Sequence, residues 1–129
     1  MSDPPDRPAL VLVCGSRGWN DRDAIERRLP DLPPDTVILH GGARGADRLA
    51  GDVAKALDLC VEVMPADWAR YGRSAGPRRN FVMIGRRPDL VLACATPSLA
   101  ASRGTRHTVA AARRAGLNLE LDEASSASR

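Results

Sequence analysis

ALVLVCGSRGWND, residues 9–21, joins an uninterrupted apolar run to a glycine-containing turn and the start of a helix. An apolar run without alternating polar residues predicts a strand over residues 9–14 that is buried on both faces, as in parallel sheets. Asn20 or Asp21 is a good N-cap, and Asp23 would lie in the first turn of the following helix. The segment therefore predicts the strand–turn–helix unit from which α/β folds are built.

The same unit recurs along the rest of the chain. Further strands are predicted over residues 36–40, 60–64, 90–95 and 117–121. Helices are predicted over residues 46–57, from Pro77 or Arg78 to Gly85, and over residues 105–115 with Gly116 as the cap. We expect an α/β, Rossmann-like three-layer sandwich with a central parallel sheet of about five strands. The loops that follow its strands would share one edge of the sheet, where such folds bind ligands.

Size and composition narrow the class of protein. The chain has 129 residues and a net charge of +3, which is too small for a general polyanion binder. We expect one domain over residues 9–121, with disordered tails at 1–8 and 122–129. Without a membrane-length apolar run or a signal-peptide core, a cytoplasmic protein is predicted. The spacing of Cys14, Cys60 and Cys94 predicts buried, reduced thiols, and we expect no metal and no cofactor.

The arginines are unevenly placed. Ten of the eighteen lie just after a predicted strand or in the first turn of the next helix: Arg17, Arg22, Arg44, Arg48, Arg70, Arg73, Arg78, Arg79, Arg103 and Arg106. A cation is disfavoured there by about 0.3–1 kcal/mol, because helix N-termini carry partial positive charge. Six others lie near predicted helix C-termini, where the dipole favours them: Arg27, Arg28, Arg86, Arg87, Arg113 and Arg114. The first group predicts an anion that binds at the strand-end edge of the sheet.

The first strand-end loop, CGSRGWND at residues 14–21, has the composition of a phosphate-binding turn. Gly15 allows the backbone N–H groups of the turn to approach a phosphate closely. Ser16 and Arg17 add side-chain donors. An ordinary turn between strand and helix is the alternative interpretation of this segment.

The second loop, HGGARGAD at residues 40–47, matches neither the dinucleotide fingerprint nor a Walker loop. It predicts an anion cradle that opens an amphipathic helix, formed by Gly41, Gly42, Arg44 and Gly45. Asp47 either accepts hydrogen bonds from a ribose hydroxyl or is an acid that the helix dipole favours. His40 ends a buried strand and is interpreted as a structural histidine, with an acid–base role as the alternative.

The third loop, DWARYGRSAGPRRN at residues 67–80, places Trp68 and Tyr71 among arginines. A long loop of this composition suits a stacked base beside phosphates, while a lid whose aromatic rings pack on the body is the alternative. Three residues at the start of the following helix would face the ligand edge, namely Arg78, Arg79 and Asn80. Phe81 is expected to face the core.

The fourth loop, ATPSLAASRGTRHT at residues 95–108, leads into the last predicted helix. Gly104 and Thr105 would offer backbone donors and a hydroxyl to a phosphate. His107 lies about one turn further along the helix. It is a candidate catalytic residue, and a solvent-facing helical position is the alternative.

Four motifs occur in order at these strand ends: GSR followed by Trp, G-x-ARGAD, AGP-x-RN-x-x-M from Ala75 to Met83, and a late GT. Together they resemble the SLOG superfamily, the Rossmann-like group named after Smf/DprA and the LOG enzymes. The small single-domain YspA-like branch, known mostly as proteins of unknown function, is the most similar. The resemblance covers residues 9–121 and implies a nucleotide or nucleotide-derived ligand at the sheet edge.

The LOG members are phosphoribohydrolases, which cleave the bond between a base and ribose 5′-monophosphate. Similarity to their motif implies a catalytic role for Arg79. Their chemistry also uses a Glu three residues after the Thr of PGG-x-GT-x-x-E, where this chain has Thr108, and residues 101–103 replace the PGG-x stretch. The sequence thus leaves open whether the ligand is hydrolysed, with His107 or Asp67 in place of that Glu, or only bound.

DprA proteins provide the rival class, because they contain similar GSR and SG-x-ARG-x-D segments and bind single-stranded DNA. A single-strand binder needs an extended basic groove with several stacking aromatic residues. This chain has two Trp, one Tyr and one Phe, so nucleic-acid binding ranks second. Similarity to LOG proteins implies a homodimer. The base and the number of phosphates stay open.

Overall fold

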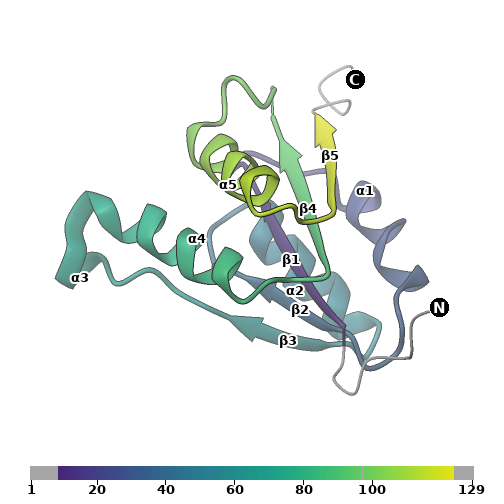
Figure 1. The fold of residues 1–129 in the computed structure, drawn as a ribbon. Coiled ribbons are helices and arrows are strands. Elements are labelled where there is room, and N and C mark those ends of the chain that lie inside the picture. Colours follow the sequence, from purple (N-terminus) through teal and green to yellow (C-terminus); the bar gives the residue numbers. More distant parts are fainter. Residues whose placement is uncertain (1–8, 97, 124–129) are drawn as a thin grey trace.

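The computed structural model describes residues 9–96 and 98–123, which form a five-stranded parallel sheet flanked by helices (Figure 1). The strands are β1 (Leu10–Gly15), β2 (Val37–His40), β3 (Cys60–Val63), β4 (Leu90–Ala95) and β5 (Leu119–Glu123). The helices are α1 (Arg22–Glu26), η1 (Leu29–Asp31), α2 (Ala46–Ala56), α3 (Trp68–Tyr71), η2 (Gly72–Ser74), α4 (Ala75–Gly85) and α5 (Arg103–Arg114). The strand order is β3-β2-β1-β4-β5, which confirms the expected α/β, Rossmann-like fold.

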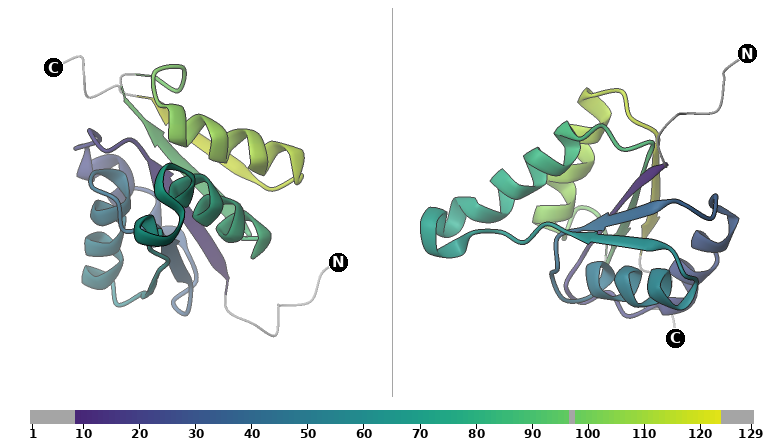
Figure 2. Two further views of the ribbon diagram at one scale, coloured as in Figure 1. Left: turned by 90° about the vertical axis from the view of Figure 1, so that its left-hand side faces the viewer. Right: turned by 90° about the horizontal axis from the view of Figure 1, so that it is seen from below.

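Helices cover both faces of the sheet (Figure 2). Val11 and Val13 of β1 pack in the core on the side of α1 and α2. The alternate residues Leu10 and Leu12 pack on the side of α4 and α5. Leu12 and Val13 have no solvent-exposed surface. A central strand therefore contributes apolar side chains to both layers, which is why β1 reads as a continuous apolar run.

The edge strand β3 differs from the central strands. Its side chains are only partly buried, and Val63 is 50% exposed. The prediction that all three thiols are buried is wrong for Cys60, which is exposed on this strand. Cys14 and Cys94 are buried as expected, and burial raises the pKa of the Cys94 thiol to about 12. An edge strand has a neighbour on one side only, so a similar apolar run is less covered.

The last strand extends past its predicted end. Asp122 and Glu123 lie in the predicted disordered tail, but in the structure they belong to β5 and pair with Cys94 and Ala95 of β4. Arg28 donates hydrogen bonds to both carboxylate oxygens of Asp122, at 2.9 and 2.8 Å. Because residues 122–123 are polar, the sequence did not predict that they belong to a strand. Arg28, which is far away in the sequence, helps to stabilise this part of β5. Residues 1–8 and 124–129, the rest of the predicted tails, lie outside the described part of the chain.

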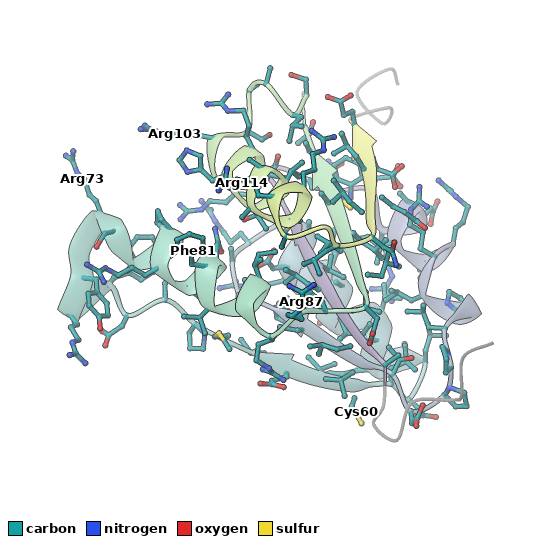
Figure 3. All side chains as sticks on the ribbon, viewed as in Figure 1. Cys60, Arg73, Phe81, Arg87, Arg103 and Arg114 are labelled. Carbon is teal, nitrogen blue, oxygen red and sulfur yellow. The ribbon has the colours of Figure 1, made fainter. Side chains whose placement is uncertain are left out.

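The predicted long loop before Pro77 contains two short helices. With the first part of α4, they form an arm that extends beyond the strand ends, and Arg73 lies at its tip (Figures 1 and 3). The expectation that Phe81 faces the core is wrong, since this side chain is 67% exposed on α4. The reason is that α4 leans away from the sheet along this arm and buries Met83 and Ile84 instead.

Helix starts follow the sequence signals closely. Asp21 caps α1, accepting a hydrogen bond from Ala24 N at 3.1 Å. The helix α4 begins at Ala75, two or three residues before its predicted start, and α5 begins at Arg103, two residues before its predicted start. Within residues 9–96 and 98–123, no helix combines the length and apolar character that a bilayer crossing requires.

Candidate functional site

A cavity lies where the strand order reverses, between the loops that follow β1 and β4. Open α/β sheets bind their ligands at this position. The cavity has a volume of about 490 Å³. Of the predicted ligand and catalytic residues, it is lined by Gly15, Ser16, Arg17, Asp47, Trp68, Arg79, Asn80, Gly104, Thr105 and His107. The fold therefore brings ten of the fifteen predicted residues, from four separate loops, to one cavity.

The turn after β1 is locked against β4. Ser16 N donates to Cys94 O at 2.9 Å, and Thr96 N donates to Ser16 Oγ at 2.9 Å. Ser16 Oγ also lies 2.5 Å from Ser102 Oγ. The Ser16 hydroxyl thus joins the two loops of the switch point, in addition to lining the cavity. Gly15 is packed so closely that a Cβ there would lie 2.3 Å from Cys94 O.

The N-terminus of α5 opens onto the same cavity. Its N-cap, Ser102, makes no side-chain hydrogen bond to the helix. Instead, the Ser102 hydroxyl donates to Ser98 O at 3.0 Å. The first-turn residues Gly104 and Thr105 line the cavity, so their backbone N–H groups are available to an anion. Arg103, whose side chain is exposed, adds a cation to the lining of the cavity.

Arg79 is the most firmly held cation of the site. Its Nη1 donates to Gly41 O at 2.6 Å and to Met64 O at 3.2 Å, and its Nε donates to Asn80 Oδ1 at 2.8 Å. Burial lowers the pKa of the guanidinium, whereas the nearby Asp47 carboxylate opposes that shift. Arginine stays protonated in proteins, so Arg79 presents a fixed positive charge to the cavity.

The glycine loop after β2 differs from the predicted anion cradle. Three consecutive backbone N–H groups are already bonded within the protein: Gly41 and Ala43 donate to Asp47 Oδ2 at 2.9 and 3.3 Å, and Gly42 donates to His40 Nδ1 at 3.0 Å. Because the loop folds inward onto these side chains, those three donors cannot cradle an anion in this conformation.

Two further predictions about this loop can be compared with the structure. His40 is buried, burial lowers its pKa, and its Nδ1 accepts from Gly42 N, which matches the structural interpretation. Gly45 does not line the cavity. Its φ is +81°, and a Cβ there would lie 2.2 Å from Ser16 O. Gly45 therefore serves the close contact between the first and second loops.

Asp47 is a buried carboxylate that lines the cavity. Only 5% of its surface is exposed, and burial raises its pKa to about 6, although the Gly41 and Ala43 N–H groups oppose the shift. Asp47 lies in the first turn of α2, as the helix-start alternative predicts, and its Oδ2 also accepts two N–H groups of the glycine loop. Asp47 braces the glycine loop and also faces the space where a ligand would bind.

We expect Asp47→Asn to change how stability depends on pH. The folded pKa of about 6 lies above the reference value of 3.8, so the folded state binds this proton more tightly than the unfolded state. The contribution of Asp47 to the free energy of unfolding is therefore complete below about pH 4 and is lost as the pH rises to about 6. The loss amounts to roughly 2–3 kcal/mol.

Urea unfolding of the wild type and Asp47→Asn from pH 4 to 7 measures this effect. The difference in unfolding free energy should shift in favour of the variant as the pH rises. Asp52→Asn, an exposed position on the same helix, controls for the loss of one negative charge. A difference that stays constant over this pH range would contradict the assignment of a raised pKa to Asp47.

A second cavity, of about 480 Å³, adjoins the first. It is lined by residues of the β2–α2 loop, the start of α2 and the segment after β3. The predicted residues Gly41, Gly42 and Arg44 line this cavity and not the first one. Arg17 and Arg79 line both. The predicted edge therefore contains two adjoining hollows.

The expectation that all ten unusual arginines converge on the ligand edge is wrong for half of them. Five line the two cavities: Arg17, Arg44, Arg48, Arg79 and Arg103. Arg22 pairs with Glu26 at 2.8 Å, and Arg106 donates to Ala100 O. Arg73 lies at the tip of the α3–α4 arm (Figure 3). The arm displaces its arginines from the sheet edge, which a pattern of strands and helices does not reveal.

The two aromatic residues of the arm have different positions. Trp68 lines both cavities and is 51% exposed. Tyr71 lines neither of them, and the guanidinium groups of Arg70 and Arg78 lie over its ring at 5.1 and 4.4 Å. Arg78, a predicted ligand residue, also lies outside both cavities. Of the two aromatic residues predicted to stack on a base, Trp68 lines the cavities and Tyr71 does not.

Sequence reasoning missed several residues of the first cavity. Cys14, Thr96 and Ser102 line it, as does Thr108, whose Oγ1 donates to Gly104 O at 3.2 Å. The sequence could have indicated Thr96 and Ser102 as site residues, because Thr96 is a polar residue that follows a buried strand and Ser102 is a polar residue at a helix start. Cys14 carried none, because its apolar run predicts only burial. Asp67 caps α3 by accepting from Arg70 N and lies outside both cavities.

Residues 9–71, which include the first two loops of this site, match the family described as the YspA, cpYpsA-related SLOG family. A similar protein is the "Gene 61 protein" of Mycobacterium phage D29, which is 39% identical over 116 residues. That alignment covers 83% of this chain and 90% of the phage protein. The chain belongs to the YspA-related SLOG family. No solved structure matches this SLOG protein.

Proposed function

We propose that this SLOG protein binds a phosphorylated nucleoside, with a phosphate at the N-terminus of α5. One observation carries the proposal: an uncapped helix start and the cations Arg17, Arg79 and Arg103 meet in a single cavity at the strand-order reversal. Helix N-termini bind anions through free N–H groups and the helix dipole. The repulsion among these cations is offset when a phosphate binds between them.

The rest of the cavity supports a nucleoside attached to that phosphate. Trp68 offers a half-exposed ring on which a base can stack. Asn80 lies beside Arg79 and accepts its Nε–H, which leaves the amide nitrogen of Asn80 as a donor to the ligand. A volume of about 490 Å³ lies in the range of small-ligand sites. Membership of the SLOG family is consistent with a nucleotide-related ligand.

We propose binding without cleavage of the N-glycosidic bond. Hydrolysis of that bond needs a carboxylate to stabilise the sugar cation or to activate water. The position of the LOG glutamate is occupied by Thr108, whose hydroxyl bonds to the helix backbone. Asp47 is the acidic residue among those that line the first cavity, and its Oδ2 already accepts two backbone N–H groups.

Chromatography of nucleoside 5′-monophosphates after incubation with the protein tests whether the N-glycosidic bond is cleaved. We expect no release of free base above the rate of a protein-free control. Release that disappears in Asp47→Asn or Arg79→Ala would instead assign phosphoribohydrolase activity to this cavity. Release that survives both variants would indicate a contaminating enzyme.

Thermal unfolding with a panel of 5′-mononucleotides tests the binding itself. A ligand at ten times its Kd stabilises the folded state by about 1.4 kcal/mol, which raises the melting temperature by several degrees in a chain of this size. We expect such a shift with at least one mononucleotide and little effect of free ribose. Strong binding to a single-stranded oligonucleotide, falling steeply with salt, would favour the DprA-like alternative. No shift with any nucleotide would reject the proposal.

A further inference from the structure

The second cavity shares a wall with the first. Both are lined by Arg17, Ala43, Trp68 and Arg79. The guanidinium of Arg79 is held at this boundary by its hydrogen bonds to Gly41 O and Met64 O. The two cavities are therefore adjoining parts of one basic surface.

The second cavity is strongly and uniformly cationic. Arg17, Arg44, Arg48 and Arg79 all line it, and its lining contains no Asp or Glu. Arg48 makes a 3.3 Å hydrogen bond to Gly42 O. Within residues 9–96 and 98–123, no ion pair or hydrogen bond engages the side chains of Arg17 and Arg44. Asp47, whose carboxylate interacts favourably with Arg79, lines the first cavity but not the second.

Such a cluster is unfavourable unless an anion binds in it. Like charges in one hollow repel, and burial together with the charge of Arg17 lowers the pKa of Arg79. Guanidinium groups bind phosphate oxygens in a bidentate manner, which suits a site built from several arginines. Val63, Pro65 and Ala66 add apolar surface to the lining of this cavity.

We propose that the second cavity binds a second phosphate-bearing group of the same ligand, so that the ligand spans Arg79 with one anionic group on either side. The inference rests on the proposed function, because the first phosphate and the nucleoside occupy the first cavity. The ligand class is then a nucleotide that carries two phosphate groups, either on two positions of one ribose or joined in one diphosphate bridge. A nucleoside 3′,5′-bisphosphate and two nucleosides joined by a diphosphate both have this chemistry.

Calorimetric titration measures the affinity for each of these two kinds of ligand. The 5′-monophosphate that binds best is compared with the 3′,5′-bisphosphate and the dinucleoside diphosphate of the same base. We expect one of the two larger probes to bind at least tenfold more tightly than the monophosphate, and which one does so identifies the source of the second phosphate. In Arg44→Gln/Arg48→Gln this preference should fall to less than threefold, while the affinity for the monophosphate changes less than twofold.

Arg113→Gln/Arg114→Gln is the matched control. It removes the same charge from adjacent helical positions that line neither cavity, and it should leave the preference unchanged. Circular dichroism checks that each variant is folded, and Arg44→Lys/Arg48→Lys keeps the charge and should retain part of the preference.

Each alternative result overturns the inference in a distinguishable way. Equal affinity of the wild type for all three probes would leave the proposed function standing and reject the second phosphate site. A preference that survives Arg44→Gln/Arg48→Gln would place the second phosphate elsewhere. In a further outcome, a single-stranded oligonucleotide binds more tightly than every small probe, and this binding disappears in Arg44→Gln/Arg48→Gln. That result would assign the cavity to a nucleic-acid backbone. A wild type that binds none of the small probes would reject both proposals.

Discussion

Replacing Gly15 with alanine is expected to lower the free energy of unfolding by about 3 kcal/mol or more, a large share of the total stability of a single domain. An added Cβ would lie 2.3 Å from Cys94 O and 2.5 Å from Ala46 Cβ. Neither atom belongs to a flexible side chain, so the strand β1, the strand β4 or the start of α2 must move. The same carbonyl accepts the Ser16 N–H that holds the first loop.

Gly18→Ala is the control for this substitution. Gly18 lies in the same loop, but a Cβ there would have Thr96 Cγ2 at 3.7 Å as its nearest neighbour, an ordinary contact. We expect a change in stability of less than about 1 kcal/mol. Urea unfolding of both variants measures the difference. Equal stabilities would show that the switch point adapts easily, and the tight junction of the two loops would then not be a requirement of the fold.

Removing the Arg79 side chain is expected to cause the largest loss of ligand affinity. Arg79→Ala removes one of the two cations that line both cavities, and also the hydrogen bonds to Gly41 O in the glycine loop and to Met64 O after β3. Hydrogen bonds to charged groups contribute about 1.5–3 kcal/mol each. We therefore expect nucleotide affinity to fall at least tenfold, and Arg79→Lys to recover only part of the loss, because a lysine cannot reproduce the planar fork.

The neighbouring arginine provides the matched control. Arg78→Ala removes the same charge from the preceding position of α4, but Arg78 lies over Tyr71 and outside both cavities. Calorimetry should show less than a twofold change for this variant. If Arg78→Ala and Arg79→Ala weaken binding equally, the effect is one of general charge and not of position. If neither does, the cavity between β1 and β4 is not the nucleotide site.

The sequence predicted those parts of the candidate site well for which the local motif and the sheet topology gave the same answer. The glycine of the first loop, the Gly-Thr at the start of α5 and the Arg-Asn pair of α4 all line one cavity, because parallel strands deliver their loops to one edge. The glycine loop after β2 was predicted less well. Its composition resembles an anion cradle, but Asp47 and His40 accept its N–H groups. Only the packing of α2 against the sheet shows which acceptors reach that loop.

Local patterns were enough to determine the strands, most helix starts and the two-layered covering of the sheet, because apolar periodicity and capping residues act over a few neighbours. Tertiary structure alone decided which arginines share a cavity, that Asp47 is buried, that residues 122–123 continue a strand and that Phe81 is exposed. These properties depend on groups far apart in the chain, such as Arg28 and Asp122, and on the angle at which α4 leaves the sheet. No short-range pattern records either of them.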